Sequence, residues 1–224
     1  MANPNTLTDG ELMLDQIQDN FKRNQKKITG VVVALIVVVG GFFGYRYYTK
    51  SQEEKAAAAL FPAERFFEVD SFRQVLDGDG QHPGVLTIIK KYSGTDAANQ
   101  AQYFAGMSLL HTGKFQEAID HLTRFNGKGT SFEFLAYGAM GDAYMEMKNT
   151  AKGIEYYAKA AKNEKDQYVA PLYLFRAGLA SEKAGNLKDA AKYYNQVRMD
   201  YPQSIQARDI DKYLARVGEL NNND

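Results

Sequence analysis

The fold is decided by QYFAGMSLLHTGKFQEAIDHL at residues 102–122, which recurs in altered form as YGAMGDAYMEMKNTAKGIEYY at 137–157 and as LFRAGLASEKAGNLKDAAKYY at 174–194. Small residues stand at two aligned places in each copy. The first place holds Gly106, Gly141 and Gly178, and the second, twelve residues later, holds Ala118, Gly153 and Ala190. Small side chains let two helices approach closely, while the Tyr, Leu and Phe around them fill the remaining space. The pattern therefore predicts three helical hairpins.

The aligned glycines lie 35 and 37 residues apart. A period near 34 residues with two helices in each unit resembles the tetratricopeptide repeat family. Gly113 and Gly185 supply the turn between the two helices of units one and three. Unit two departs from the pattern, since Lys148 and Asn149 stand at its turn and Gly153 replaces the usual alanine. The resemblance implies an all-α fold in which three clear repeats, with flanking helices, stack into a superhelix.

Toward the N-terminus, residues 28–48 read ITGVVVALIVVVGGFFGYRYY and carry no charge from Ile28 through Tyr45. At a rise of about 1.5 Å per residue, roughly 20 apolar residues cross the hydrocarbon core of a bilayer. A buried core helix of this length would show a polar stripe. A cleaved signal peptide would have a shorter apolar region followed by a small-residue site. The sequence therefore predicts a single transmembrane helix ahead of the repeats.

Basic residues on the two sides of this stretch predict its orientation. The N-terminal flank carries Lys22, Arg23, Lys26 and Lys27, and the C-terminal flank carries the more widely spread Arg46, Lys50 and Lys55. By the positive-inside rule the leader stays in the cytoplasm and the repeat domain crosses the membrane. Gly40 and Gly44 form a G-x-x-x-G pair, which predicts close packing against another membrane helix.

These patterns divide the chain into five parts. They are a cytoplasmic leader with a short amphipathic helix at 1–27, the transmembrane helix at 28–48, juxtamembrane and capping helices at 49–97, the three repeats at 98–204, and a closing helix with a disordered tail at 205–224. Because proline is not tolerated in a helix interior, Pro62 predicts one helix that ends near Leu60 and a second that runs from Pro62 to Leu76.

Composition and motifs argue against several classes of function. Residues 51–224 carry 21 basic and 23 acidic side chains. This balance lacks the excess of basic side chains that is typical of nucleic-acid binding. The chain has no cysteine, and its three histidines have no metal-ligand spacing. Asp77 and Asp79 begin like a calcium loop, but Ile88 stands where the bidentate Glu belongs. We therefore expect no catalytic residue, no metal site and no cofactor, and we expect a protein that is not an enzyme.

The remaining candidate for a functional site is a binding surface on the repeats. The first helices of stacked repeats line a concave groove that binds peptides. Projected onto this face, the three units predict a groove lined by Tyr103, Met107, Leu110, Asp142, Met145, Leu172, Phe175, Arg176 and Leu179. Some tetratricopeptide domains hold chaperone tails with Lys and Asn at the places of Tyr103 and Met107, so that clamp is absent here. The sequence leaves open whether upstream helices fill the groove.

The layout of leader, single anchor and repeat domain resembles the ancillary subunit family of the bacterial SecYEG translocon. Stretches such as AERFFEVDSF, GDAYMEM and RDIDKYLAR are similar to the versions found in Bacteroidetes-type bacteria. The resemblance implies an inner-membrane protein with a periplasmic domain, whose partners are translocon subunits, periplasmic chaperones and unfolded clients. Two alternatives stay open, namely a cytosol-facing tetratricopeptide receptor and a self-associating coordinator of envelope growth or division.

Overall fold

A computed structural model describes residues 9–163 and 166–219, and these ranges are helical apart from turns and one isolated bridge between Gly78 and Pro83. The predicted disordered tail lies outside the described residues. The chain divides into two compact units, Met1–Ser51 and Gln52–Asp224. The helices are α1 (Asp9–Glu68), α2 (Phe72–Asp77), α3 (Val85–Lys91), α4 (Asp96–His111), α5 (Phe115–Arg124), α6 (Ser131–Glu146), α7 (Thr150–Ala160), α8 (Val169–Lys183), α9 (Leu187–Asp200), a 3₁₀ turn η1 (Gln206–Asp209) and α10 (Ile210–Arg216).

The first unit is formed by the N-terminal part of α1. This part contains one stretch that is long and apolar enough to cross a membrane, and no residue of its most apolar window is buried. Large apolar side chains from Val31 to Phe43 are about half exposed or more. A run of exposed apolar side chains on a soluble protein marks a surface that another apolar phase covers. The stretch is therefore a candidate membrane span.

The predicted helix break at Pro62 is wrong, because α1 continues through Pro62 to Glu68. Proline costs a helix one hydrogen bond and clashes with the preceding turn. Here Leu60 and Ala63, on either side of the proline, are almost fully buried, so tertiary packing holds the helix together across the site. The chain turns instead at Asp70, whose φ of 56° lies in the left-handed region.

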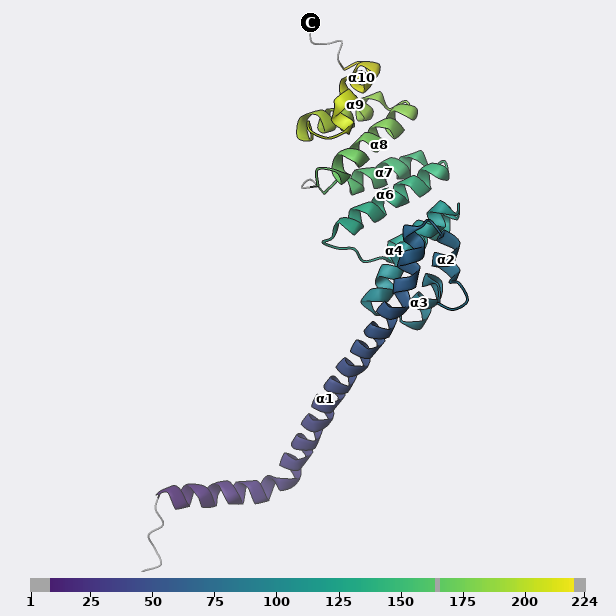
Figure 1. Cartoon of the computed structure of the whole chain (residues 1–224). Helices are drawn as coiled ribbons and strands as arrows, with labels where there is room; N and C mark the ends of the chain where they lie inside the picture. The colour runs from purple at the N-terminus through teal and green to yellow at the C-terminus, as the bar shows by residue number, and fades with distance from the viewer. Residues whose placement is uncertain (1–8, 164–165, 220–224) are drawn as a thin grey trace, which may run out of the picture. The chain divides into compact units, whose positions relative to one another are not determined.

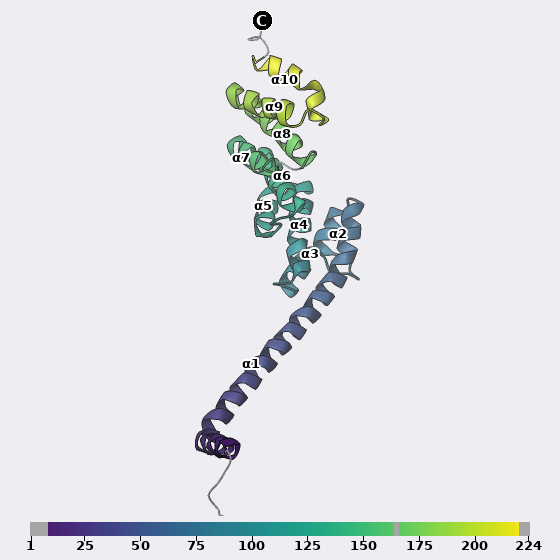
Figure 2. The ribbon, with the colours of Figure 1, turned by 90° about the vertical axis from the view of Figure 1, so that its left-hand side faces the viewer.

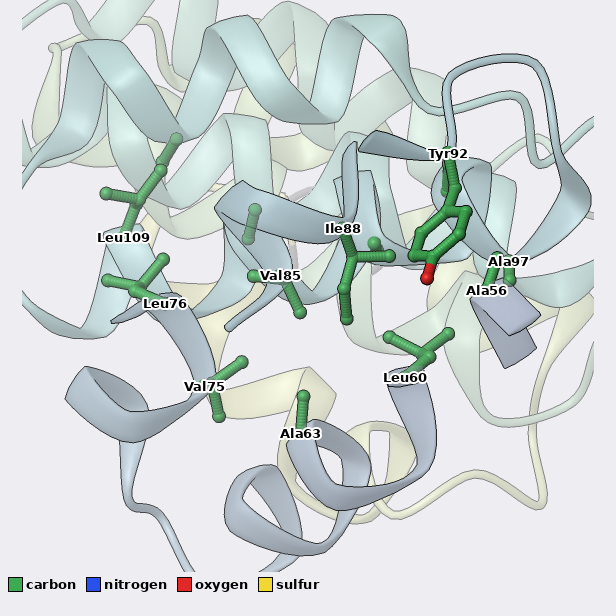
Figure 3. Packing of buried hydrophobic residues seen from close by; sticks show 14 residues of the cluster. Ala56, Leu60, Ala63, Val75, Leu76, Val85, Ile88, Tyr92, Ala97 and Leu109 are labelled. Atoms are coloured by element: carbon green, nitrogen blue, oxygen red, sulfur yellow. The ribbon is translucent and has the colours of Figure 1, made fainter. Parts of the chain in front are cut away.

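The second unit begins with a core that caps the repeats. Leu60 and Ala63 of α1 meet Val75 and Leu76 of α2, Val85 and Ile88 of α3, and Leu109 of α4 (Figure 3). The carboxylate of Glu53 in α1 also accepts hydrogen bonds from the backbone N–H groups of Asp96 (2.7 Å) and Ala97 (3.0 Å) at the start of α4. Anionic side chains stabilise helix N-termini, so Glu53 fastens α1 to the first repeat.

Three helical hairpins follow, α4 with α5, α6 with α7, and α8 with α9, and each stacks on the next (Figures 1 and 2). The aligned glycines have the predicted role. A Cβ atom on Gly106 would collide with Leu122, one on Gly141 with Tyr157, and one on Gly178 with Tyr194. At the turns, Gly113 and Gly185 adopt φ values of 78° and 80°, and Lys148 adopts 62° in the unit that lacks the glycine.

The closing helix covers the last repeat. Ile210 and Leu214 of α10 are buried against the same core as Tyr194 and Val197 of α9. Ala207 of the preceding 3₁₀ turn and Val217 just after the helix pack against this core as well.

Candidate functional site: the first-helix faces of the repeats

The first repeat contributes an aromatic cluster centred on Tyr103 of α4. The Tyr103 ring contacts Phe104 (ring centroids 5.9 Å apart), Phe125 (5.3 Å) and Phe132 (5.3 Å). Tyr103 itself is 9% exposed, whereas Phe132 at the start of α6 is 52% exposed. Burial raises the pKa of the Tyr103 phenol. Tyr103 therefore forms the floor of this face, and Phe132 is its accessible edge.

Asp142 and Arg176, which the sequence placed in the groove, form a pair. Arg176 Nη1 donates to both Asp142 carboxylate oxygens at 2.7 Å, and the Tyr157 hydroxyl donates to the same carboxylate at 2.5 Å. The guanidinium carbon lies 5.5 Å from the centroid of the Tyr173 ring, within range of a cation–π interaction. We call these four residues the Asp142 cluster. It joins three successive helices, α6, α7 and α8, and so locks repeat two to repeat three.

The same arrangement recurs at the end of the domain. Arg216 Nη2 donates to Glu182 at 2.7 Å, Tyr194 donates to the same oxygen at 2.8 Å, and the Arg216 guanidinium lies 4.7 Å from the Tyr213 ring centroid. In this Glu182 cluster, α8, α9 and α10 take the places of α6, α7 and α8. Arginine follows its acidic partner by 34 residues in both clusters. Helix α10 therefore docks as the first helix of a further repeat would.

Ionisation in the two clusters follows from this geometry. Burial, and next the hydrogen bond to Asp142, raise the pKa of Tyr157, and the same causes, with Glu182 as partner, raise that of Tyr194. Burial raises the pKa of Tyr173 to about 12. The hydrogen bond from Arg216 is the largest cause that lowers the pKa of Glu182. At neutral pH the three tyrosines are therefore uncharged and Glu182 is ionised, so that Glu182 pairs with Arg216.

The other predicted groove residues are half-buried. They are Met107, Leu110, Met145, Leu172, Phe175 and Leu179. Leu110 packs against the upstream core, and Phe175 contacts Tyr213 of the closing helix, with ring centroids 4.8 Å apart. Flanking helices thus cover part of the face at both ends of the domain.

A cavity of about 410 Å³ opens beside the aromatic cluster. Tyr103, Phe104, Phe125 and Phe132 supply most of its apolar wall, and Glu64 of α1 and Asp96 of α4 supply carboxylates. Reciprocal hydrogen bonds fix the connection between α5 and α6 that forms one side. Asn99 Nδ2 donates to the Asn126 carbonyl (3.0 Å), and the Asn126 N–H donates to Asn99 Oδ1 (2.7 Å).

Residues 139–205 match the tetratricopeptide repeat family model. The matched segment runs from α6 into the turn after α9, and thus covers the second and third hairpins. No curated protein matches the chain. Together with the ten α-helices of the described ranges, the match confirms the predicted all-α fold with tetratricopeptide repeats. Tetratricopeptide repeats are non-enzymatic protein-interaction modules, and this region is accordingly a protein–protein interaction scaffold.

The polar groups that the sequence analysis weighed as metal ligands make other contacts in the described part of the chain. Residues 9–163 and 166–219 contain no set of three or more His, Cys, Asp or Glu side chains placed to hold a metal ion. His111 stacks on Phe72, and His121 Nδ1 lies 2.6 Å from Gln102 Oε1. The Asp79 carboxylate accepts N–H bonds from Gln81 and His82, and the latter is the main cause that lowers its pKa to about 2. Each of these groups therefore has a protein partner in the described structure.

Sequence reasoning missed several residues of this face. Tyr157, Tyr194, Glu182 and Arg216 were not assigned to it, and neither was Phe132. A signal for Arg216 was present, since the Tyr-x-x-Arg pattern at 173–176 recurs at 213–216 in the predicted closing helix. The pair Gly40 and Gly44 lies on α1, where an added Cβ on either would meet nothing within 4 Å, and its packing role stays a prediction.

Proposed function

We propose that this protein is a single-pass membrane protein whose helix α1 anchors an interaction scaffold outside the cytoplasm. The observation that supports the anchor is the uncharged, unburied stretch from Ile28 to Tyr45. In water this exposure of apolar surface would cost about 25 cal/mol for each Å². A bilayer removes that cost, and the backbone of a helix satisfies its own hydrogen bonds there.

The anchor is tested by alkaline carbonate extraction of membranes. We expect the protein to remain in the membrane pellet. In a double variant Leu35→Lys and Val38→Lys, two charges enter the middle of the span at about 3 kcal/mol each, so the chain moves to the soluble fraction. A matched variant, Leu35→Phe and Val38→Phe, keeps the membrane fraction. Extraction of the unaltered protein into the supernatant would exclude the anchor.

The scaffold acts, in this proposal, at the site of protein export. Its partners are translocon subunits, periplasmic chaperones and unfolded clients, for which the repeat domain is the docking platform. Support comes from the layout of leader, one span and repeats. The stronger basic cluster ahead of the span also favours, by the positive-inside rule, a periplasmic domain on an inner-membrane protein.

Co-purification in mild detergent tests the export role. We expect translocon subunits to co-purify with the full chain. If the repeat domain makes the contact, they also co-purify with a variant whose residues 28–48 are replaced by an unrelated apolar stretch of equal length. Translocon subunits absent from both preparations would refute the association.

Self-association through Gly40 and Gly44 has its own test. The double variant Gly40→Leu and Gly44→Leu abolishes a dimer cross-link that forms through that face and leaves any other cross-link unchanged.

A further inference from the structure

The cavity beside Tyr103 combines an aromatic lining with two acidic residues. Four aromatic rings, those of Tyr103, Phe104, Phe125 and Phe132, line one cavity of about 410 Å³. Glu64 and Asp96 bring two carboxylates to the same cavity, and no Lys, Arg or His is among its lining residues in the described part of the chain. The electrostatic character of the cavity is therefore negative.

We propose that this cavity binds a Lys or Arg side chain of a partner polypeptide. The proposal rests on the proposed function of the repeat domain as a protein scaffold and names the chemistry of its partner. Aromatic faces attract cations, more strongly where the cation is partly desolvated. The two carboxylates add charge-assisted hydrogen bonds to an ammonium or guanidinium group. Arginine fits best because its planar guanidinium also stacks on aromatic rings.

The neighbouring cavity shows that this charge is particular to the Tyr103 site. It lies on the other side of the connection between α5 and α6, has a similar volume of about 410 Å³, and shares Phe125 and Asn126. Its lining includes Lys128 and Lys159 as well as Glu133, so its charges are mixed. A cation on a partner is therefore directed to one side of the connection and not to the other.

A polypeptide fits this site better than a small free amine. Phe132, which lines the cavity, is 52% exposed, which leaves room for residues that flank the bound cation. The exposed Gln100 amide lines the same wall and can hydrogen-bond to a peptide backbone. Tyr103 belongs to the first-helix face on which tetratricopeptide domains hold extended peptides.

The test uses the full chain in detergent micelles and fluorescence anisotropy with short blocked peptides. The peptides share one sequence of Leu and Ser and differ only at a central Arg, Lys, norleucine or Glu. We expect the Arg and Lys peptides to bind about tenfold more tightly than the norleucine peptide, a difference typical of a partly desolvated cation on aromatic rings. The Glu peptide binds most weakly.

Two pairs of variants locate the effect. Glu64→Gln with Asp96→Asn reduces the affinity for the Arg peptide to that for the norleucine peptide, whereas Glu117→Gln with Asp120→Asn on α5 changes nothing. Phe132→Ala weakens every peptide, and Phe61→Ala, which removes an exposed phenylalanine outside the cavity, does not. Circular dichroism confirms that each variant is folded. Equal affinities for the four peptides, whatever their central residue, would overturn this inference and leave the scaffold role intact. Failure of every peptide to bind would overturn the inference, and the scaffold role is then judged separately by co-purification.

Discussion

Asp142→Ala should loosen the junction between the second and third repeats. The carboxylate accepts two hydrogen bonds from Arg176 at 2.7 Å and one from Tyr157 at 2.5 Å. Hydrogen bonds to charged groups contribute about 1.5–3 kcal/mol, and a buried hydroxyl left without a partner costs about 1–3 kcal/mol. The side chains of Arg176 and Asp142 are 38% and 34% exposed, so solvent screens the ion pair. We therefore expect a loss of about 2–3 kcal/mol in the free energy of unfolding.

The assay is hydrogen exchange of the full chain in micelles, read over α6, α7 and α8, with denaturant unfolding as a second measurement. A local readout is needed because repeat arrays need not unfold in one step. Asp142→Asn, which can still accept from Tyr157, should lose about half as much. The control is Glu155→Ala, which breaks an exposed, solvent-screened pair with Lys159 (2.7 Å) within α7 and should leave exchange over the three helices nearly unchanged. The reasoning is refuted if Asp142→Ala exchanges no faster than this control.

Other perturbations test the remaining contacts. Gly138→Ala places a Cβ inside the Tyr173 ring, so we expect about 1–3 kcal/mol of destabilisation in denaturant unfolding, whereas Gly30→Ala, which meets nothing, has no such effect. The pKa of Glu182 is lowered in the folded state, so its stabilisation is complete above the ordinary value of 4.5 and is lost as pH falls below it; protection of α10 from exchange should drop there, and Arg216→Ala should remove this pH dependence. Glu53→Ala removes two hydrogen bonds at the start of α4, where Thr95 remains the N-cap, and should cost about 1 kcal/mol, against no change for the exposed Glu68→Ala; equal stability of these two variants would exclude a stabilising role of Glu53. Tyr157 and Tyr194 have raised pKa values, so the folded domain should lose stability above pH 10, and their tyrosinate absorbance should emerge together with unfolding.

The hairpins could be predicted because their signal is local and repeated. Gly106, Gly141 and Gly178 mark the places where a second helix comes too close for any side chain, and the spacing of two such places fixes a hairpin. The turn of the second unit lacks the glycine signal. Lys148 nevertheless adopts there the left-handed conformation that Gly113 and Gly185 adopt in the other two turns. The family match at 139–205 rests on the same periodicity.

What the sequence missed depends on contacts between elements. Pro62 predicts a break by local rules, and burial of Leu60 and Ala63 against α2 and α3 overrides them. Asp142 and Arg176 could be placed on one face but not paired, because the pair forms only when two repeats stack. The role of Phe132 depends on how the connection between α5 and α6 folds back on Tyr103, and no periodicity encodes that path.

The central claim is that one membrane helix presents this tetratricopeptide domain outside the cytoplasm. Protease added to cells with a permeabilised outer layer and an intact inner membrane tests it most directly, with antibodies against residues 1–27 and against the region after Gln52. The account predicts that the repeat domain is digested while the leader, with α1 through the span, stays protected. A repeat domain that survives until the inner membrane is lysed would contradict it.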